Sequence, residues 1–246
     1  MKQPTPHQRH SPSPTFLEDR ALAPFLHLFF PSLCYLCEVR KPMRGHRLCA
    51  RCLALLPRTD FHLWPDNPFA ERFWGRIPLY AGAACFFFCK GGLARKLVHK
   101  LKYEGRKELG IWAGREYGRE LREAPVFSEV DCILPVPLHW KKLLQRGFNQ
   151  SVCFAEGLAE SMSVPWYSGV LVRESYTDTQ TRKSQMERLR NVGAAFAVRH
   201  TKTLENRHVL LVDDVLTTGA TLEACALTLL KVPGVKISMA TIALAT

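Results

Sequence analysis

The stretch VLLVDDVLTTGAT, residues 209–221, decides the fold of this chain. Its four leading apolar residues predict a buried strand over 209–212, and this strand ends at two carboxylates, Asp213 and Asp214. A short loop rich in hydroxyl groups follows, and residues 221–230 are predicted to form a helix. Because ligands bind at the carboxyl ends of strands in an open parallel sheet, this strand–loop–helix unit predicts a binding site.

The residue types in this unit indicate which ligand it suits. Backbone N–H groups at the start of the helix, together with the hydroxyls of Thr217, Thr218 and Thr221, can hold one phosphate group. Two adjacent carboxylates can hold a pair of vicinal hydroxyls, directly or through Mg²⁺. A sugar with a 5-phosphate and free 2- and 3-hydroxyls fits this arrangement. The alternative is a strand and a capped helix that are acidic by chance.

Strands and helices alternate along the rest of the chain. The predicted strands are 80–89 (or a hairpin there), 132–136 and 236–242, with shorter candidates at 170–172 and 193–198; the predicted helices are 93–103, 109–121 and 151–161. Such alternation is typical of βαβ units, so the predicted fold class is α/β with a parallel sheet. No Gly-x4-Gly-Lys-Ser/Thr loop and no Gly-x-Gly-x-x-Gly after a strand occur, which disfavours P-loop ATPases and dinucleotide-binding folds.

Four cysteines near the amino terminus have the spacing of a metal site. Cys34 and Cys37 form one Cys-x2-Cys turn, and Cys49 and Cys52 form another after eleven intervening residues. Two such turns can complete a tetrahedron of thiolates around zinc, and four cysteines leave no open position, so the predicted site is structural. The alternatives are four buried thiols, a disulfide pair, or iron in the same geometry.

Composition bounds the class of protein. Hydrophobic residues make up 47% of the 246 residues, which is enough for a packed core, and 34 Lys and Arg against 22 Asp and Glu give a net charge of +12. This excess favours polyanionic partners, namely nucleic acid, phosphorylated metabolites or an anionic membrane surface, without choosing among them. No run reaches the ~18 apolar residues of a membrane span, so we expect a soluble, cytoplasmic protein with no transmembrane segment.

The basic charge is concentrated in residues 90–107, where seven cations stand against one acid, Glu104. Cations for phosphates and aromatic faces for bases are what a single-stranded nucleic acid requires. The candidates for such contacts are Lys96, Lys100, Lys102 and Tyr103. The alternative is a solubilising helix face.

Several segments in a fixed order resemble the ComF family of competence proteins, also known as ComFC or GntX-like proteins. These segments are the four-cysteine pattern, LKYEG at 101–105, LPVPLH at 134–139, RGFNQ at 146–150, TDTQ at 177–180, RLRNV at 188–192, AF at 195–196 and the acidic loop. The acidic loop itself resembles the signature for 5-phosphoribosyl-1-pyrophosphate (PRPP) in type I phosphoribosyltransferases. The resemblance covers residues 25–246 and implies a zinc ribbon followed by a type I phosphoribosyltransferase-like domain with flanking helices.

The resemblance also implies roles for individual residues. Asp213 and Asp214 would bind the ribose hydroxyls of PRPP, and the 5-phosphate would lie on Thr217, Thr218, Gly219, Ala220 and Thr221. Leu138 and His139 belong to a loop over 137–142 that would grip pyrophosphate, while a segment over 173–190 would form a hood. The hood differs from the family pattern because Thr-Arg-Lys stands at 181–183 where many relatives have Gly-Leu.

Phosphoribosyl transfer needs charge stabilisation more than a general acid and base, because its transition state resembles an oxocarbenium ion and its leaving group is pyrophosphate. Mg²⁺ and nearby cations would neutralise that leaving group. The catalytic candidates next to the loop are Lys141, Lys142 and Arg146, and the alternative for them is a solvated basic loop.

These observations predict four segments and one main function. The segments are a disordered tail over 1–20, a helix and zinc ribbon over 21–58, a linker over 59–76 and the phosphoribosyltransferase-like domain over 77–246. The main hypothesis is a ComF-like protein that handles incoming single-stranded DNA in natural transformation, with a PRPP and Mg²⁺ site, structural zinc and other DNA-uptake proteins as partners. The alternatives are an active phosphoribosyltransferase with a small nitrogenous acceptor, and a PRPP sensor without turnover.

Overall fold

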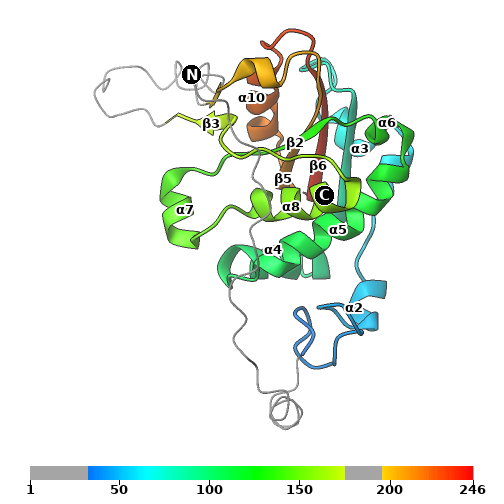
Figure 1. The fold of residues 1–246 in the computed structure, drawn as a ribbon. Helices are drawn as coiled ribbons and strands as arrows, with labels where there is room; N and C mark the ends of the chain where they lie inside the picture. Colours follow the sequence, from blue (N-terminus) through cyan, green and yellow to red (C-terminus); the bar gives the residue numbers. More distant parts are fainter. Residues whose placement is uncertain (1–32, 175–195, 246) are drawn as a thin grey trace. The chain divides into compact units, whose positions relative to one another are not determined.

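The computed structural model describes residues 33–174 and 196–245 (Figure 1). The chain divides into two compact units, one that ends at Leu56 and one that begins at Pro57. The predicted tail, the apolar segment before residue 33 and the segment 175–195, which includes most of the predicted hood, lie outside the described residues. In the part of the chain that is described, no helix is long and apolar enough to cross a membrane.

The first unit is built mainly of turns. The N–H of Cys34 donates to the carbonyl of Arg40 at 2.8 Å, and one helix, α2 (Ala50–Ala54), follows the second pair of cysteines. Apart from cysteines, its fully buried side chains among the described residues are Leu36 and Leu48. Even with Leu56, which is 6% exposed, these leucines make a very small apolar core, so we expect the four cysteines to be central to the stability of this unit.

The second unit contains a parallel sheet of four strands in the order β1-β6-β5-β2. The strands are β1 (Ala81–Phe88), β2 (Cys132–Pro135), β5 (His208–Leu216) and β6 (Lys236–Ala245). The two central strands are almost entirely buried, which explains why they read as continuous apolar runs rather than as alternating ones. The predicted α/β class with a parallel sheet is confirmed.

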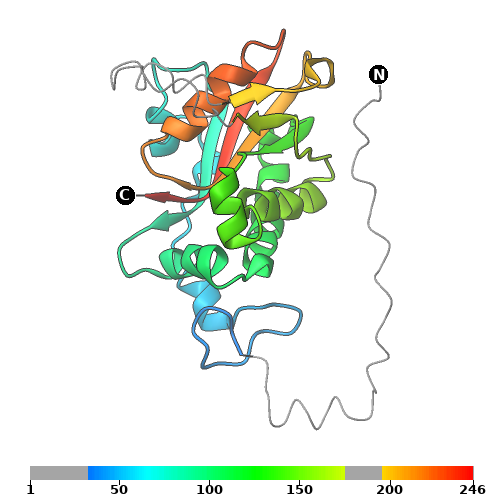
Figure 2. The ribbon, with the colours of Figure 1, turned by 90° about the vertical axis from the view of Figure 1, so that its left-hand side faces the viewer.

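Helices cover both faces of this sheet (Figures 1 and 2). One face carries α4 (Leu93–Tyr103), α5 (Lys107–Glu123) and α8 (Gln150–Met162), and the other carries α10 (Ala220–Leu229). Helices α5 and α8 cross closely: a Cβ on Gly114 would lie 2.3 Å from the carbonyl oxygen of Phe154, and one on Gly157 would lie 2.1 Å from that of Ile111. This contact, which requires glycine on both helices, fixes α8 firmly beside the sheet.

Residues 59–76, predicted as a linker, pack within the second unit. They include a 3-10 helix, η1 (Phe61–Leu63), and a short helix, α3 (Pro68–Glu71). The Asn67 side chain accepts from two N–H groups of α3 and donates to the carbonyl of Gly82 in β1 at 2.9 Å. Because Phe69 and Phe73 are also fully buried, the segment contributes to the core despite its irregular sequence pattern.

Strand β5 and the loop after β2 differ from the sequence prediction. Strand β5 does not end before the two carboxylates but continues to Leu216, because it pairs with β6 as far as Leu216 opposite Leu244. The loop predicted over 137–142 is shorter than expected, since helix α7 (Trp140–Arg146) begins inside it. The His139 ring accepts the Lys141 N–H at 3.2 Å and so caps this helix.

The remaining described elements are small. Strands β3 (Leu171–Arg173) and β4 (Phe196–Val198) correspond to the two shorter strand candidates, and they pair antiparallel in a separate sheet of two strands. A short helix, α6 (Pro125–Ser128), follows α5, and a 3-10 helix, η3 (Thr201–Thr203), follows β4.

Candidate functional site

The two predicted ligand carboxylates lie at the carboxyl end of the parallel sheet. Strand β2 ends beside them, because the N–H of Val136 donates to the carbonyl of Val212 at 2.9 Å. Asp213 lies opposite Thr241 of β6, so its backbone is held inside the sheet rather than in a loop. The sheet therefore presents both acids from a rigid strand.

The Asp213 carboxylate is held by the first turn of α8. Its Oδ1 atom accepts from the Ser151 hydroxyl at 2.8 Å and from the N–H of Asp214 at 2.8 Å. Asn149 fixes this turn, because its Oδ1 accepts the N–H of Ser151 at 3.1 Å and its Nδ2 donates to the carbonyl of Val136 at 2.9 Å. The segment RGFNQ thus sets the start of α8 against the end of β2 and places Ser151 on the acid pair.

The Asp214 carboxylate has a different partner. Its Oδ1 atom lies 2.9 Å from Nζ of Lys102 in α4, and the two side chains are 12% and 21% exposed. The sequence predicted nucleic-acid contacts for Lys102, and in the structure its ammonium group lies against a carboxylate of the predicted ribose site. Nothing in the local pattern of α4 signals this contact, because the two residues belong to distant elements.

The environment of Asp213 changes its acidity. Burial, followed by the neighbouring Asp214 charge, raises the pKa of Asp213 to about 7, although the hydrogen bond from Ser151 acts in the opposite direction. A carboxyl group with a raised pKa is disfavoured in its charged form, so the folded protein is destabilised where that form prevails.

Replacing Asp213 with Asn is therefore expected to stabilise the fold at pH 8 but hardly at pH 4.5. An unfolded Asp ionises near pH 4, so the wild type loses stability as the pH rises from about 4 to 7, and this loss is complete above pH 7. Asn keeps an acceptor for Ser151 and does not ionise. A gain of about 1 kcal/mol or more, or roughly 2–4 °C in Tm, is expected at pH 8. An equal shift at both pH values in thermal unfolding contradicts this account.

The hydroxyl-rich loop follows β5 directly. A small hollow of about 40 Å³ is lined by Asp213 and by residues 215–222. Gly219 has φ 82°, in the left-handed region, and a Cβ there would lie 3.1 Å from the ring of Phe73. Glycine is therefore required where the loop turns into α10. The hollow gathers every residue that the sequence assigned to the 5-phosphate: Thr217, Thr218, Gly219, Ala220 and Thr221.

Two arginines from the predicted linker support this loop. Arg72 donates to the carbonyl of Thr217 and, through Nη2, to that of Ala245 at 2.5 Å. Arg76 pairs with Glu223 in the first turn of α10, with Nε 3.1 Å from Oε1. Sequence reasoning missed both residues because their segment has no periodic pattern.

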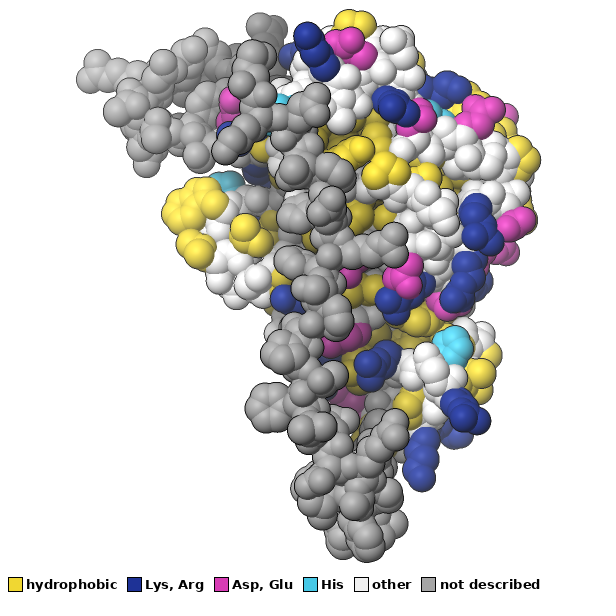
Figure 3. Space-filling view, viewed as in Figure 1, with side chains coloured by type: hydrophobic (Ala, Val, Ile, Leu, Met, Phe, Trp, Pro, Cys, Tyr) yellow, Lys and Arg dark blue, Asp and Glu magenta, His cyan; other side chains and the backbone are white. Residues whose placement is uncertain are grey.

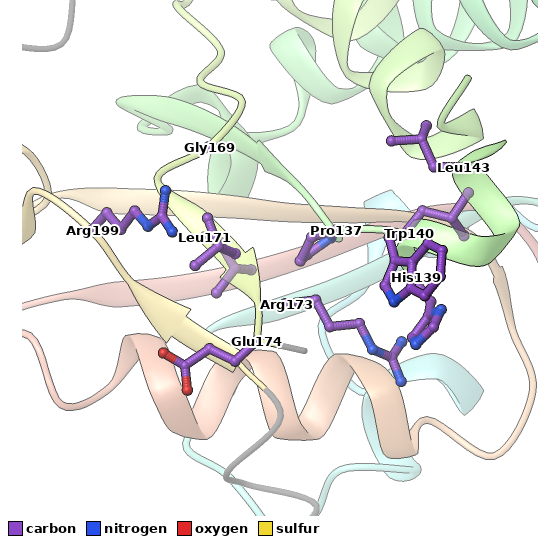
Figure 4. Close-up of a pocket in the computed structure, with 11 residues that line it drawn as sticks. Pro137, His139, Trp140, Leu143, Gly169, Leu171, Arg173, Glu174 and Arg199 are labelled. Carbon is purple, nitrogen blue, oxygen red and sulfur yellow. The ribbon is translucent and has the colours of Figure 1, made fainter. Parts of the chain in front are cut away.

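A larger pocket of about 500 Å³ opens beyond the end of β2 (Figure 4). Its walls come from Pro137 to Trp140, from Leu143 and from the β3–β4 pair with the residues next to it. Figure 4 shows the Arg173 guanidinium directed toward the His139 and Trp140 rings, while the Glu174 carboxylate points away from them. The two rings stack with centroids 5.9 Å apart. The cationic groups on this pocket are thus Arg173 and Arg199.

The predicted catalytic cations occupy a different place. Lys141, Lys142 and Arg146 are carried by α7, and none of them lines the two hollows described above. Lys141 lies 5.5 Å from the centroid of Trp140, and Arg146 donates to Gln150 at 2.8 Å. The sequence predicted a basic segment beside the loop after β2. It did not predict α7, which has no buried residue and directs these side chains away from the two hollows.

The predicted nucleic-acid residues on α4 do not share one environment. Lys96 is exposed and Tyr103 is 62% exposed, but Lys100 is buried and pairs with Glu104 at 2.8 Å. Because Lys102 pairs with Asp214, two of the three predicted lysines are directed to partners within the protein. Arg146 of α7 lies over the Tyr103 ring at 5.4 Å, so the exposed end of α4 continues into α7.

Helix α7 projects an apolar surface. It has no buried residue, and Trp140, Leu143 and Leu144 are 51%, 43% and 76% exposed. Figure 3, in the same view as Figure 1, shows yellow apolar side chains gathered on the protruding part that Figure 1 labels α7. An exposed aromatic residue beside Lys141 and Lys142 is a feature of surfaces that bind other molecules.

The four predicted metal ligands come together in the first unit. The Sγ atoms of Cys34, Cys37, Cys49 and Cys52 all lie within 4.8 Å of one another. Backbone N–H groups of Val39 and Arg40 lower the pKa of Cys37 to about 6, which favours the thiolate that a metal requires. In the described ranges this is the one group of three or more His, Cys, Asp or Glu residues that could hold a metal ion. Four thiolates in this arrangement fit a zinc ribbon.

Comparison with known proteins agrees with this architecture. A family model described as a phosphoribosyl transferase domain matches residues 149–246. DNA utilization protein YhgH of Salmonella typhi is 35% identical over 214 residues, which cover 83% of this chain and 93% of that protein. The protein of the same name from Escherichia coli K12 is 29% identical over 221 residues, with the same coverage. Competence protein F of Haemophilus influenzae is 31% identical over 134 residues, which cover 51% of this chain and 57% of that protein.

The matched domain contains β5, the acid pair, the hydroxyl-rich loop and α10, and the match to the YhgH proteins extends over 93% of their length. Together with the clustered cysteines, these similarities show that the chain belongs to the ComF family of proteins with a phosphoribosyltransferase domain.

Proposed function

We propose that this protein binds PRPP with Mg²⁺ at the carboxyl edge of its sheet and handles single-stranded DNA. The observation that supports PRPP most strongly is the arrangement of three features along one sheet edge. These are the carboxylates of Asp213 and Asp214, the hollow formed by the loop after them, and the larger pocket, whose lining begins at Pro137. The residue before Pro137, Val136, donates its N–H to the carbonyl of Val212 in β5 and so ties the start of this pocket to the strand that carries the acids.

Each part of PRPP has a matching environment in this arrangement. The ribose hydroxyls would donate hydrogen bonds to the carboxylates of the acid pair, and the 5-phosphate would lie on the N–H groups at the start of α10. Pyrophosphate would extend toward His139 and Arg173, and the Arg173 guanidinium brings positive charge to this end of the larger pocket.

The residues present also fit a magnesium ion. Mg²⁺ prefers carboxylate and phosphate oxygens, and Asp213 and Asp214 supply carboxylates beside the proposed position of the sugar. When bound, the ion would neutralise negative charge on the pyrophosphate group. The protein's own part is to orient the sugar and to surround the leaving group with cations.

Thermal unfolding with separate ligand fragments tests this proposal. A ligand that binds the folded state alone raises Tm according to its concentration and Kd. We expect Mg²⁺ with PRPP to raise Tm more than Mg²⁺ with ribose 5-phosphate or with pyrophosphate, because each fragment occupies one part of the site. Equal shifts with PRPP and with pyrophosphate alone would contradict a site for the sugar.

An active phosphoribosyltransferase is the second candidate, and the pocket of about 500 Å³ beyond the end of β2 favours it. In that reaction the bond from the anomeric carbon to pyrophosphate breaks, a nitrogen of the acceptor bonds to that carbon, and the nitrogen loses a proton to water. Pyrophosphate release with a panel of bases and amines separates this candidate from a PRPP sensor, which binds PRPP without releasing pyrophosphate.

The proposal for DNA is supported by the net charge of +12, by the names of the relatives and by an exposed basic and aromatic surface. We define the α4–α7 surface as Lys96, Tyr103, Trp140, Lys141, Lys142 and Arg146. The contact between Arg146 and Tyr103 joins its two helices, and its aromatic rings are exposed. Single-stranded nucleic acid binds to such combinations of cations and aromatic faces.

Neutralising Lys96, Lys141 and Lys142 together is expected to weaken binding of single-stranded DNA of any sequence. The dependence of log K on log salt should become shallower by about 2, because each phosphate contact contributes about −0.7. Replacing Trp140 with Ala should cost about 1–3 kcal/mol if a base stacks there. Arg122→Gln, on the exposed side of α5, is the control and should change neither quantity.

Two results would contradict this DNA proposal. One is wild-type protein that does not bind single strands at low salt in a fluorescence anisotropy titration. The other is a deletion strain that takes up and integrates DNA at the normal frequency, which would exclude a role in transformation.

A further inference from the structure

Lys102 is the one cation in an ion pair with the acid pair among the described residues. Its Nζ atom lies 2.9 Å from Oδ1 of Asp214. The Asp214 side chain is 12% exposed and that of Lys102 is 21% exposed, so solvent screens this pair much less than it screens a surface ion pair. The ammonium group therefore contributes strongly to the electric field at the carboxylates.

The backbone that carries Lys102 is fixed in place. Leu97 and Leu101 of α4 are fully buried, and the neighbouring Lys100 is tied to Glu104 at 2.8 Å. The flexible side chain of Lys102 is thus tethered beside the acid pair and cannot diffuse away. A tethered cation remains close to the carboxylates whether or not a ligand is bound.

The other carboxylate is satisfied without a cation. Oδ1 of Asp213 accepts from the Ser151 hydroxyl and from a backbone N–H, both at 2.8 Å, and these donors are neutral. Lys102 therefore supplies the positive charge that offsets the acid pair. Without it, two adjacent carboxylates would attract any free divalent cation and repel a polyanionic sugar phosphate.

We propose that Lys102 is a specificity-determining residue that makes the acid pair reject free divalent cations and accept an anionic sugar phosphate. This inference rests on the proposed PRPP site. It assigns to Lys102 the selection between free divalent cations and an anionic sugar phosphate as the ligand of the acid pair. The metal would then enter the site together with the phosphorylated ligand rather than before it.

A merely structural ion pair makes a different prediction. If Lys102 only held α4 against β5, its loss would loosen the site and weaken every ligand. If it sets the charge of the site, its loss strengthens binding of a cation and weakens binding of an anion. Opposite signs for the two ligands are the signature of the proposed role.

The test compares Lys102→Met with Lys102→Arg, which keeps the charge, in the full-length protein with its cysteine site loaded with metal. Arg95→Met, on the exposed side of the same helix, is the matched control. Binding of Mn²⁺ alone is followed by electron paramagnetic resonance, and binding of PRPP with Mg²⁺ by calorimetry. For Lys102→Met we expect about tenfold tighter Mn²⁺ and about tenfold weaker PRPP, as for loss of one charged contact. Lys102→Arg and Arg95→Met should remain close to wild type.

A second pair of variants keeps the inference testable if Lys102→Met folds poorly. Asp214→Asn removes the partner of Lys102, so adding Lys102→Met to it should produce much less gain in Mn²⁺ affinity than Lys102→Met produces alone. Unchanged or weaker Mn²⁺ binding by folded Lys102→Met overturns the inference. Wild-type protein that binds no PRPP, while Mn²⁺ binding tightens in Lys102→Met, overturns the proposed PRPP site and confirms the exclusion of free cations.

Discussion

Replacing Cys34 or Cys52 with Ser is expected to release one zinc ion per chain and to unfold the first unit. The four Sγ atoms lie within 4.8 Å of one another, so loss of one ligand breaks a four-coordinate site. Apart from cysteines, the fully buried side chains of this unit are Leu36 and Leu48 among its described residues. So small a core does not stabilise a chain segment of this length without a metal or a cross-link.

The size of the expected effect follows from the energy of structural zinc. Its apparent binding free energy in small zinc-finger peptides is about 10–16 kcal/mol, and this energy is also the folding energy of such units. Elemental analysis and limited proteolysis of the region before Pro57 measure the two consequences. Cys89→Ser, at an exposed cysteine outside the cluster, is the control and should keep its zinc. The zinc ribbon is contradicted if wild-type protein contains no metal and the Cys34→Ser and Cys52→Ser variants resist proteolysis as well as wild type does.

Replacing Asp213 and Asp214 together with Asn is expected to weaken binding of PRPP with Mg²⁺ by at least about tenfold. The ribose hydroxyls lose charged acceptors, and each such hydrogen bond contributes roughly 1.5–3 kcal/mol. Asn preserves the shape of both side chains, and its Oδ1 atom can still accept from Ser151. The effect on binding therefore reports charge rather than collapse of the strand.

A matched control lies at the opposite edge of the same sheet. Asp131, the residue before β2, pairs with Arg207 at 3.1 Å. It also accepts the N–H of His208, the first residue of β5, at 2.7 Å. Asp131→Asn removes a charge of the same kind far from the proposed site and should leave PRPP affinity unchanged. The assignment of Asp213 and Asp214 would be contradicted if Asp131→Asn lost as much PRPP affinity as the double variant, or if the folded double variant lost none.

Most of the fold could be predicted from the sequence because its central strands are buried on both faces. Continuous apolar runs such as 209–212 identify parallel strands, and helical spacing identified α4, α5 and α8 to within a few residues. Helix α7 could not be predicted in this way. Its apolar residues face solvent, so no pattern of burial distinguishes it from a loop.

The candidate site was predicted as far as its residues are neighbours in the chain. Asp213, Asp214 and the loop after them form one local motif, and the structure brings the loop residues around one hollow. Lys102, Ser151 and Arg72 reach this region from α4, α8 and the segment before β1. Their roles depend on how distant elements pack, and no local spacing in the sequence contains that information.

Titration calorimetry of the wild-type protein with PRPP and Mg²⁺ tests the central claim most directly. One PRPP should bind per chain, more tightly than ribose 5-phosphate or pyrophosphate under the same conditions, and the Asp213→Asn, Asp214→Asn double variant should lose at least about tenfold in affinity. Folded wild-type protein that binds no PRPP, or binds it no more tightly than it binds pyrophosphate, would contradict the account.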